Sequence, residues 1–159
     1  MATSSYRKAP SFLNYLGQGD HDLQTDTVKL YLAASGLTSS VAYTKYHATT
    51  ASASILTEFA EGTGSYTGGG ADIGNTWNAT GSGYELACTS SMVFTASDNA
   101  WAGFRLVGIY NASTATTAGD ALTHELVGYW DYGSVVTLTS GDTFTVTFTG
   151  SRVFAIGAA

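Results

Sequence analysis

The clearest pattern in the chain is a strict alternation of apolar residues and threonines at Thr143–Thr149. Phe144, Val146 and Phe148 occupy every second position, and threonines fill the positions between them. Side chains of a β-strand point alternately to its two faces, so this pattern predicts a strand with one buried and one solvated face. We therefore expect Phe144, Val146 and Phe148 to form one wall of the core.

Short segments that alternate or are continuously apolar recur along the chain, with turn residues between them. Gly81 and Gly83 indicate one turn, and Ser140-Gly141-Asp142 indicates a hairpin turn to the strand that precedes it. So many short strands predict an all-β fold, either a sandwich or a barrel. We expect an antiparallel β-sandwich with jelly-roll connectivity, because this limits exposed strand edges. The other predicted strands are Thr27–Ala33, Ile55–Phe59, Asp72–Trp77, Tyr84–Thr89, Met92–Ala96, Phe104–Tyr110, Leu122–Trp130, Val135–Leu138 and Arg152–Ile156.

The first 20 residues carry no strand pattern. Ser11 is a candidate cap for a single helical turn, which Gly17 and Gly19 would end. We predict an extended N-terminal arm with this short helical turn at residues 1–20, followed by a single β-sandwich domain at residues 21–159. The arm is expected to order on a partner surface, and a frayed terminus is the alternative. The predicted partner-contact residues are Tyr6, Arg7, Lys8, Phe12 and Tyr15.

Two stretches are read as loops. Small polar residues dominate Ser35–Ala53, which predicts a long loop or a weak edge strand. Glycines dominate residues 61–70, and because glycine tolerates positive φ angles, this stretch predicts turns.

Charged residues make up only 11% of the chain, whereas a typical soluble domain has about 25%. The net charge of −6 argues against nucleic-acid binding, which needs clustered Lys and Arg. Residues 1–12 lack the apolar segment of a signal peptide, and no run of about 18 apolar residues occurs. We therefore expect a protein made in a cytoplasm, with no nucleic-acid or membrane partner. The single cysteine, Cys88, is expected to be a packed strand thiol.

No catalytic or cofactor motif is present in the sequence, so we expect no enzyme activity, no cofactor and no metal site. Asp20, Asp22 and Asp26 are expected to accept hydrogen bonds from turn amides, and His124 is expected to be packed. A metal site at His21 or His124 is the alternative. A glycosidase pair would have to come from the available acids, which are Glu58, Glu61, Glu85, Asp98, Glu125 and Asp131.

Aromatic side chains are the remaining candidates for a binding site. Packing in the core is the main expectation for them, and a protein interface or a sugar-stacking platform are the alternatives. The residues concerned are Trp77, Trp101, Trp130, Tyr129 and Tyr132.

Several motifs resemble a group of tailed-phage virion proteins. The segment His-Asp-Leu-Gln-Thr-Asp-Thr-Val-Lys-Leu-Tyr-Leu at residues 21–32 is similar to the histidine-aspartate, threonine-aspartate and apolar strand with which this group opens. The glycine-rich turn at residues 61–70 is similar to the group's glycine-tyrosine-threonine-glycine-glycine turn. Trp101, Leu-Val-Gly-Tyr-Trp-Asp-Tyr-Gly at residues 126–133 and Ser-Gly-Asp-Thr-Phe-Thr-Val at residues 140–146 follow the same layout.

The resemblance covers residues 21–156 and implies a small β-sandwich protein of the virion. Its motifs are structural, so the resemblance implies no active site. A capsid decoration, or cement, protein on the head surface is what it suggests, with the major capsid protein as partner and synthesis in the host cytoplasm. Self-association, as a trimer at a local threefold, is expected because closed symmetry satisfies exposed strand edges. A tail or fibre component and a carbohydrate-binding module of the virion are the alternatives.

Overall fold

The computed structural model describes residues 6–34, 42–47, 55–59, 66–89, 91–97, 100–115 and 123–157. Within this part of the chain, strands dominate and one short α-helix occurs, which confirms the all-β class. The elements are β1 (Tyr6–Lys8), α1 (Phe12–Gln18), β2 (Val28–Ala34), β3 (Lys45–His47), β4 (Ile55–Thr57), β5 (Ala71–Asp72), β6 (Thr76–Thr80), β7 (Gly83–Ala87), β8 (Met92–Thr95), β9 (Trp101–Ala115), β10 (Thr123–Leu138), β11 (Thr143–Val146), the 3₁₀ turn η1 (Thr149–Ser151) and β12 (Arg152–Gly157).

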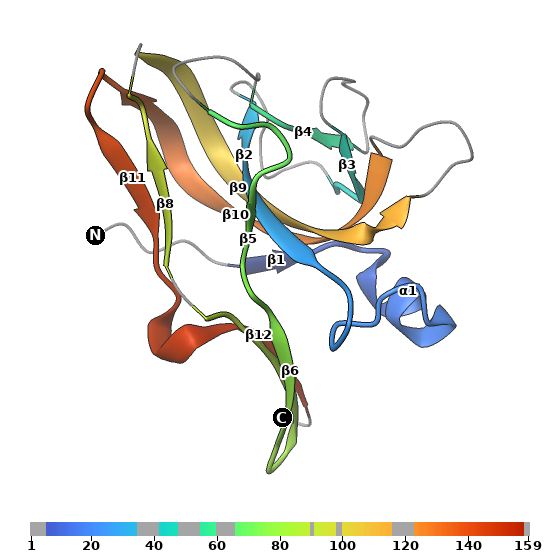
Figure 1. The fold of residues 1–159 in the computed structure, drawn as a ribbon. Coiled ribbons are helices and arrows are strands. Elements are labelled where there is room, and N and C mark those ends of the chain that lie inside the picture. The colour runs from blue at the N-terminus through green and yellow to red at the C-terminus, as the bar shows by residue number, and fades with distance from the viewer. Residues whose placement is uncertain are drawn as a thin grey trace.

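The largest sheet has the strand order β4-β3-β10-β9-β2-β5, and β1 also pairs with β10. Its neighbouring strands are antiparallel except β3 and β4, which are parallel. The long strands β9 and β10 are bulged and curl around the core (Figure 1). Two small sheets, β11-β8 and β12-β7-β6, complete the fold. These layers agree with a sandwich, and jelly-roll connectivity stays a prediction.

The core lies between the curled sheet and β8. Trp101 and Phe104 of β9 are almost fully buried, and the Phe104 ring contacts Phe144 of β11 with centroids 4.8 Å apart. Strand β2 is buried on both faces, because Tyr31 is fully buried as well as Leu30 and Leu32. The Tyr31 ring covers Gly108, where an added Cβ would lie 2.4 Å from the ring.

The segment Thr143–Thr149 has the predicted alternation but less depth. Phe144, Val146 and Phe148 pack against the core and are only partly buried, while the intervening threonines are exposed. The prediction was therefore right about which side chains of this segment face the core. It was wrong about how deeply they are buried.

The turn at Ser140-Gly141-Asp142 leads to a different partner strand from the one predicted. Strand β11 pairs with β8 and not with β10, whose pairing edges are taken by β9, β3 and β1. The Gly141 amide donates to the Ala96 carbonyl at 2.6 Å, and the Ala96 amide donates to the Asp142 carbonyl at 3.0 Å. These bonds attach the turn to the end of β8, so a β10–β11 hairpin does not form.

Two predicted boundaries also change. The segments Leu122–Trp130 and Val135–Leu138 belong to one strand, β10, which continues through Gly133 with φ at 91°. Asp72–Trp77 instead divides into β5 and β6 at Gly74, whose φ is 56° and whose amide donates to the Asp72 carboxylate.

The predicted arm folds onto its own chain from Tyr6 onward. Strand β1 pairs with β10, and Tyr6 stacks on Phe154 with ring centroids 5.3 Å apart. Phe12 of α1 is fully buried and contacts the same Phe154 ring at 5.5 Å. The predicted separation of an arm at residues 1–20 from the β domain is therefore wrong for residues 6–20, because their aromatic rings complete the core.

Candidate interaction surface

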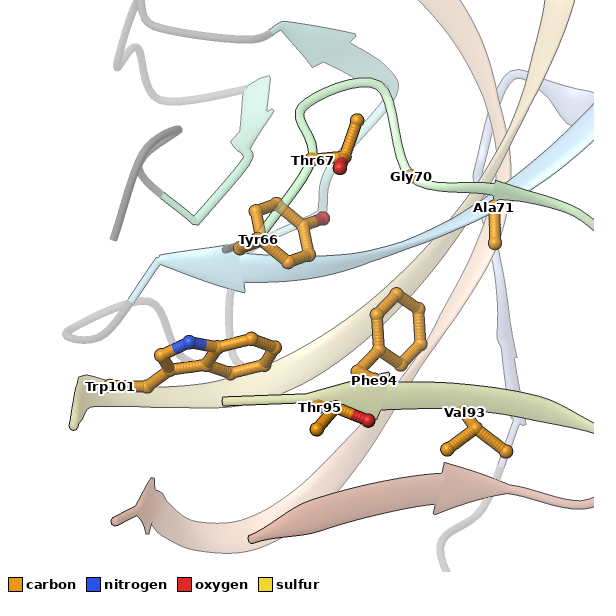
Figure 2. Close-up of a pocket in the computed structure, with 8 residues that line it drawn as sticks. All are labelled: Tyr66, Thr67, Gly70, Ala71, Val93, Phe94, Thr95 and Trp101. Atoms are coloured by element: carbon orange, nitrogen blue, oxygen red, sulfur yellow. The ribbon is translucent and has the colours of Figure 1, made fainter. Parts of the chain in front are cut away.

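A shallow pocket of about 190 Å³ lies between the segment 66–71 and strand β8 (Figure 2). Tyr66 and Phe94 project into it from opposite sides, and Trp101 closes one end. The Val93 side chain leaves β8 on the face opposite Phe94, where 59% of its surface is exposed (Figure 2). The remaining lining residues are Thr67, Gly70, Ala71 and Thr95.

The chemistry of this pocket is that of aromatic rings and small uncharged groups. The Tyr66 hydroxyl donates to Glu58 Oε1 at 2.7 Å and accepts from the Leu32 amide at 3.2 Å. Burial, reinforced by the nearby Glu58 carboxylate, raises the pKa of Tyr66 far above its usual value. The hydroxyl is therefore protonated and is hydrogen-bonded both as a donor and as an acceptor.

Beneath the pocket, Glu58 is a buried carboxylate with only 2% of its surface exposed. Besides the Tyr66 hydroxyl, it accepts hydrogen bonds from the Tyr46 hydroxyl at 2.5 Å and from the Gly69 amide at 3.0 Å. The Tyr110 hydroxyl donates to the Gly69 carbonyl at 2.8 Å. Through Glu58, the end of β4 holds β3 and the segment that lines the pocket.

The tyrosine rings make this cluster compact. Tyr46 stacks on Tyr110 with ring centroids 3.9 Å apart, and the Tyr31 ring meets Tyr46 edge-on at 4.7 Å. Burial raises the pKa of Tyr110 to about 12. The sequence pattern did not find this cluster, because Tyr46 lies in the polar stretch Ser35–Ala53. The presence of two tyrosines, Tyr43 and Tyr46, in an otherwise small and polar stretch was the sequence feature that could have indicated a buried cluster.

Other acids in the described part of the chain also have structural partners. Asp131 makes a bidentate ion pair with Arg105 at 2.8 and 2.9 Å. Two further ion pairs among the described residues join Arg152 to Glu85 at 2.7 Å and Lys45 to Glu125 at 3.9 Å. Of the acids considered for a glycosidase pair, Glu61 and Asp98 lie outside the described residues. Most of the predicted loop Ser35–Ala53, namely residues 35–41 and 48–53, also lies outside them, as does Asp120.

Two of the aspartates near His21, Asp22 and Asp26, have the expected turn roles. Asp26 accepts from the Asp22 amide at 2.8 Å, and Asp22 accepts from the Gln24 amide at 3.2 Å. No group of three or more candidate ligands that could hold a metal ion occurs in the described ranges. His124 packs beside the rings of Tyr110 and Tyr46, as a packed histidine would.

His21 is buried, and its geometry fixes its tautomer. The Asn111 side-chain oxygen accepts from the Ser113 amide, so the Asn111 side-chain nitrogen is the donor toward His21 Nδ1 at 3.1 Å and toward Asp26. Nδ1 therefore accepts and Nε2 carries the proton. Burial lowers the pKa of His21, although Asp26 and Asp20 oppose this effect.

This lowered pKa predicts a loss of stability at acidic pH. The unfolded chain takes up a proton on His21 near pH 6.5, whereas the folded protein does so only at lower pH. The contribution of His21 is thus fully present above 6.5 and is lost as pH falls toward the folded pKa. An NMR titration should give His21 a pKa below 6.5, and a value at or above 6.5 would contradict the prediction.

The predicted partner-contact residues differ in how far the structure buries them. Phe12 is fully buried and Tyr6 is half-buried in the chain's own core, so neither is presented to a partner as predicted. Tyr15 is half-buried near Glu125. Arg7 and Lys8 are exposed on β1, and their contact with a partner stays a prediction.

The aromatic candidates mostly belong to the core. Trp101 and Tyr129 are buried, and Trp130 packs beside Tyr6. Tyr132 is 39% exposed. Cys88 is buried, as expected.

The comparisons with known proteins add no relative: no family model matches the sequence, no curated protein matches it, and no solved structure matches the fold. Within the described residues, no helix is long and apolar enough to cross a membrane.

Proposed function

We propose that this chain is a non-catalytic structural protein of a tailed-phage virion, which binds the major capsid protein and decorates the outer surface of the head. The observation that carries this proposal is the uncharged surface formed by β8 and the pocket beside it. All the lining residues are uncharged, and Val93 is 59% exposed on the outer face of β8. The cores of protein interfaces are poor in charge and rich in aromatic residues, so this surface suits contact with another protein.

The hydrogen bonds and ion pairs made by two acidic side chains support a structural role. Glu58 is held by hydroxyl and amide donors, and Asp131 is held by Arg105. These contacts join β3 to the end of β4 and to the segment that lines the pocket, and β9 to β10. The choice of the phage head rests on the sequence resemblance at residues 21–156, and a threefold trimer there stays a prediction.

Cosedimentation with purified heads and purified tails tests the proposal. The wild-type protein is expected to sediment with heads and to remain in solution with tails. Val93→Lys puts a charge into the proposed contact and should weaken head binding by about tenfold or more. Leu13→Lys is the matched control, because Leu13 is an aliphatic residue on α1 with 48% exposure.

Three results would contradict parts of this proposal. Sedimentation with tails alone would establish the tail alternative, and binding to neither particle would remove the virion role. Equal head binding by the Val93→Lys and Leu13→Lys variants would exclude the β8 surface as the contact. A glycan array that gives specific signals would favour the carbohydrate-binding alternative.

A further inference from the structure

The open strand edges of this fold are protected to different degrees. Strand β1 carries Arg7 and Lys8 and is followed by Pro10, and β12 begins with Arg152. Charges and proline on an edge strand normally prevent pairing with another chain. Strand β6, Thr-Trp-Asn-Ala-Thr, is the edge of the sheet β12-β7-β6 and has no charge and no proline. It also pairs with β7 without a bulge over all its residues.

The hairpin geometry shows which backbone groups of β6 point outward. Thr80 pairs with Gly83 across the turn formed by residues 81 and 82. The pair that closes a two-residue turn exchanges both backbone hydrogen bonds, and bonding alternates along an antiparallel strand. The N–H and C=O groups of Thr80 and Asn78 therefore face β7. Those of Trp77 and Ala79 face away from the sheet.

We propose that two copies of this chain pair antiparallel through β6, about a twofold axis at Asn78. In this register Trp77 lies opposite the second copy's Ala79, and both residues present outward-facing backbone groups. Each such pair can exchange two hydrogen bonds. A large ring lies opposite a small side chain, Thr76 lies opposite the second copy's Thr80, and no charges oppose each other.

The surroundings of β6 favour a second copy as the occupant. Glu85 on the adjacent strand is neutralised by Arg152 at 2.7 Å, so the net charge of −6 is not concentrated at this edge. Trp77 and Tyr84 stack with ring centroids 5.6 Å apart on one face, and Tyr84 is 51% exposed. In the pair, these rings form one continuous apolar face. The β6 tip projects away from the largest sheet, which leaves room for the second copy (Figure 1).

The contact is a single short strand, so it is smaller than the roughly 1,200 Å² that stable interfaces bury. Weak, concentration-dependent association is therefore expected in solution. This contact is separate from the predicted threefold association and does not depend on the proposed function.

Sedimentation equilibrium over a concentration series up to about 1 mM is the test, because a dissociation constant in this range corresponds to about 4 kcal/mol. The wild-type protein should form dimers as its concentration rises. Asn78→Lys puts like charges opposite each other at the axis and should abolish dimers. Asn14→Lys, on an exposed position of α1, is the matched control and should behave as the wild type.

Mixing two variants of opposite charge separates loss of pairing from loss of folding, because misfolded variants would not form dimers with each other. Asn78→Lys mixed with Asn78→Asp should restore dimers that contain one copy of each, while each variant alone stays monomeric. A wild-type protein that is monomeric throughout the series would overturn the proposal. Dimers of Asn78→Lys alone, or no restoration in the mixture of folded variants, would do the same.

Discussion

Replacement of Glu58 by alanine is expected to lower the free energy of unfolding by about 3 kcal/mol or more. The carboxylate accepts hydrogen bonds from Tyr46, Tyr66 and Gly69, and all would lose their acceptor. A buried donor that is left without a partner costs about 1–3 kcal/mol. For a chain of this size, the melting temperature should fall by roughly 6–12 °C, which thermal unfolding followed by circular dichroism would measure.

Glu85→Ala is the matched control for this experiment. Glu85 makes an ion pair with Arg152, whose side chain is largely exposed, and an exposed ion pair contributes about 0–1 kcal/mol. The control should therefore melt close to the wild type. If Glu58→Ala and Glu85→Ala melted at the same temperature, Glu58 would not hold β3, β4 and the pocket segment together.

Replacement of Phe12 by alanine should cost about 3–5 kcal/mol, the usual penalty for removing a buried phenylalanine ring. Phe12 is fully buried and packs against Phe154 and His21, with ring centroids 5.5 and 5.3 Å away. The loss would leave a cavity where α1 meets the β-sheets. Chemical denaturation of the wild-type and Phe12→Ala proteins would measure the difference.

Leu13→Ala, at the neighbouring position, separates the two possible roles of this segment. Leu13 is 48% exposed, so its truncation should change stability little. If the segment were an arm that becomes ordered only on a partner, both variants would melt like the wild type. Phe12→Ala would then affect particle binding alone, which contradicts the packing observed here.

The alternating patterns predicted the strands well, because alternation reports directly which face of a strand is buried. Thr143–Thr149, Met92–Ala96 and Arg152–Ile156 all contain strands at the predicted places. Strand pairing was harder to predict, since the same turn at Ser140-Gly141-Asp142 serves equally for a hairpin or for a crossover to β8. Only the bonds between this turn and Ala96 decide that choice.

The buried sites were the least predictable part. Tyr6 and Phe12 lack periodic neighbours, and their burial depends on the distant ring of Phe154. The burial of Glu58 was equally hard to predict, because its hydrogen-bond donors Tyr46 and Tyr66 come from separate segments. A one-dimensional pattern records the face of each strand and cannot record which side chains meet across the core.

Electron microscopy of virions purified from cultures that express this chain tests the proposed function most directly. If the protein decorates the head as proposed, density of the size and shape of this β-fold is expected on the outer surface of the head, in contact with the major capsid protein. Density for this chain confined to the tail, or complete particles that lack it, would contradict the proposed function.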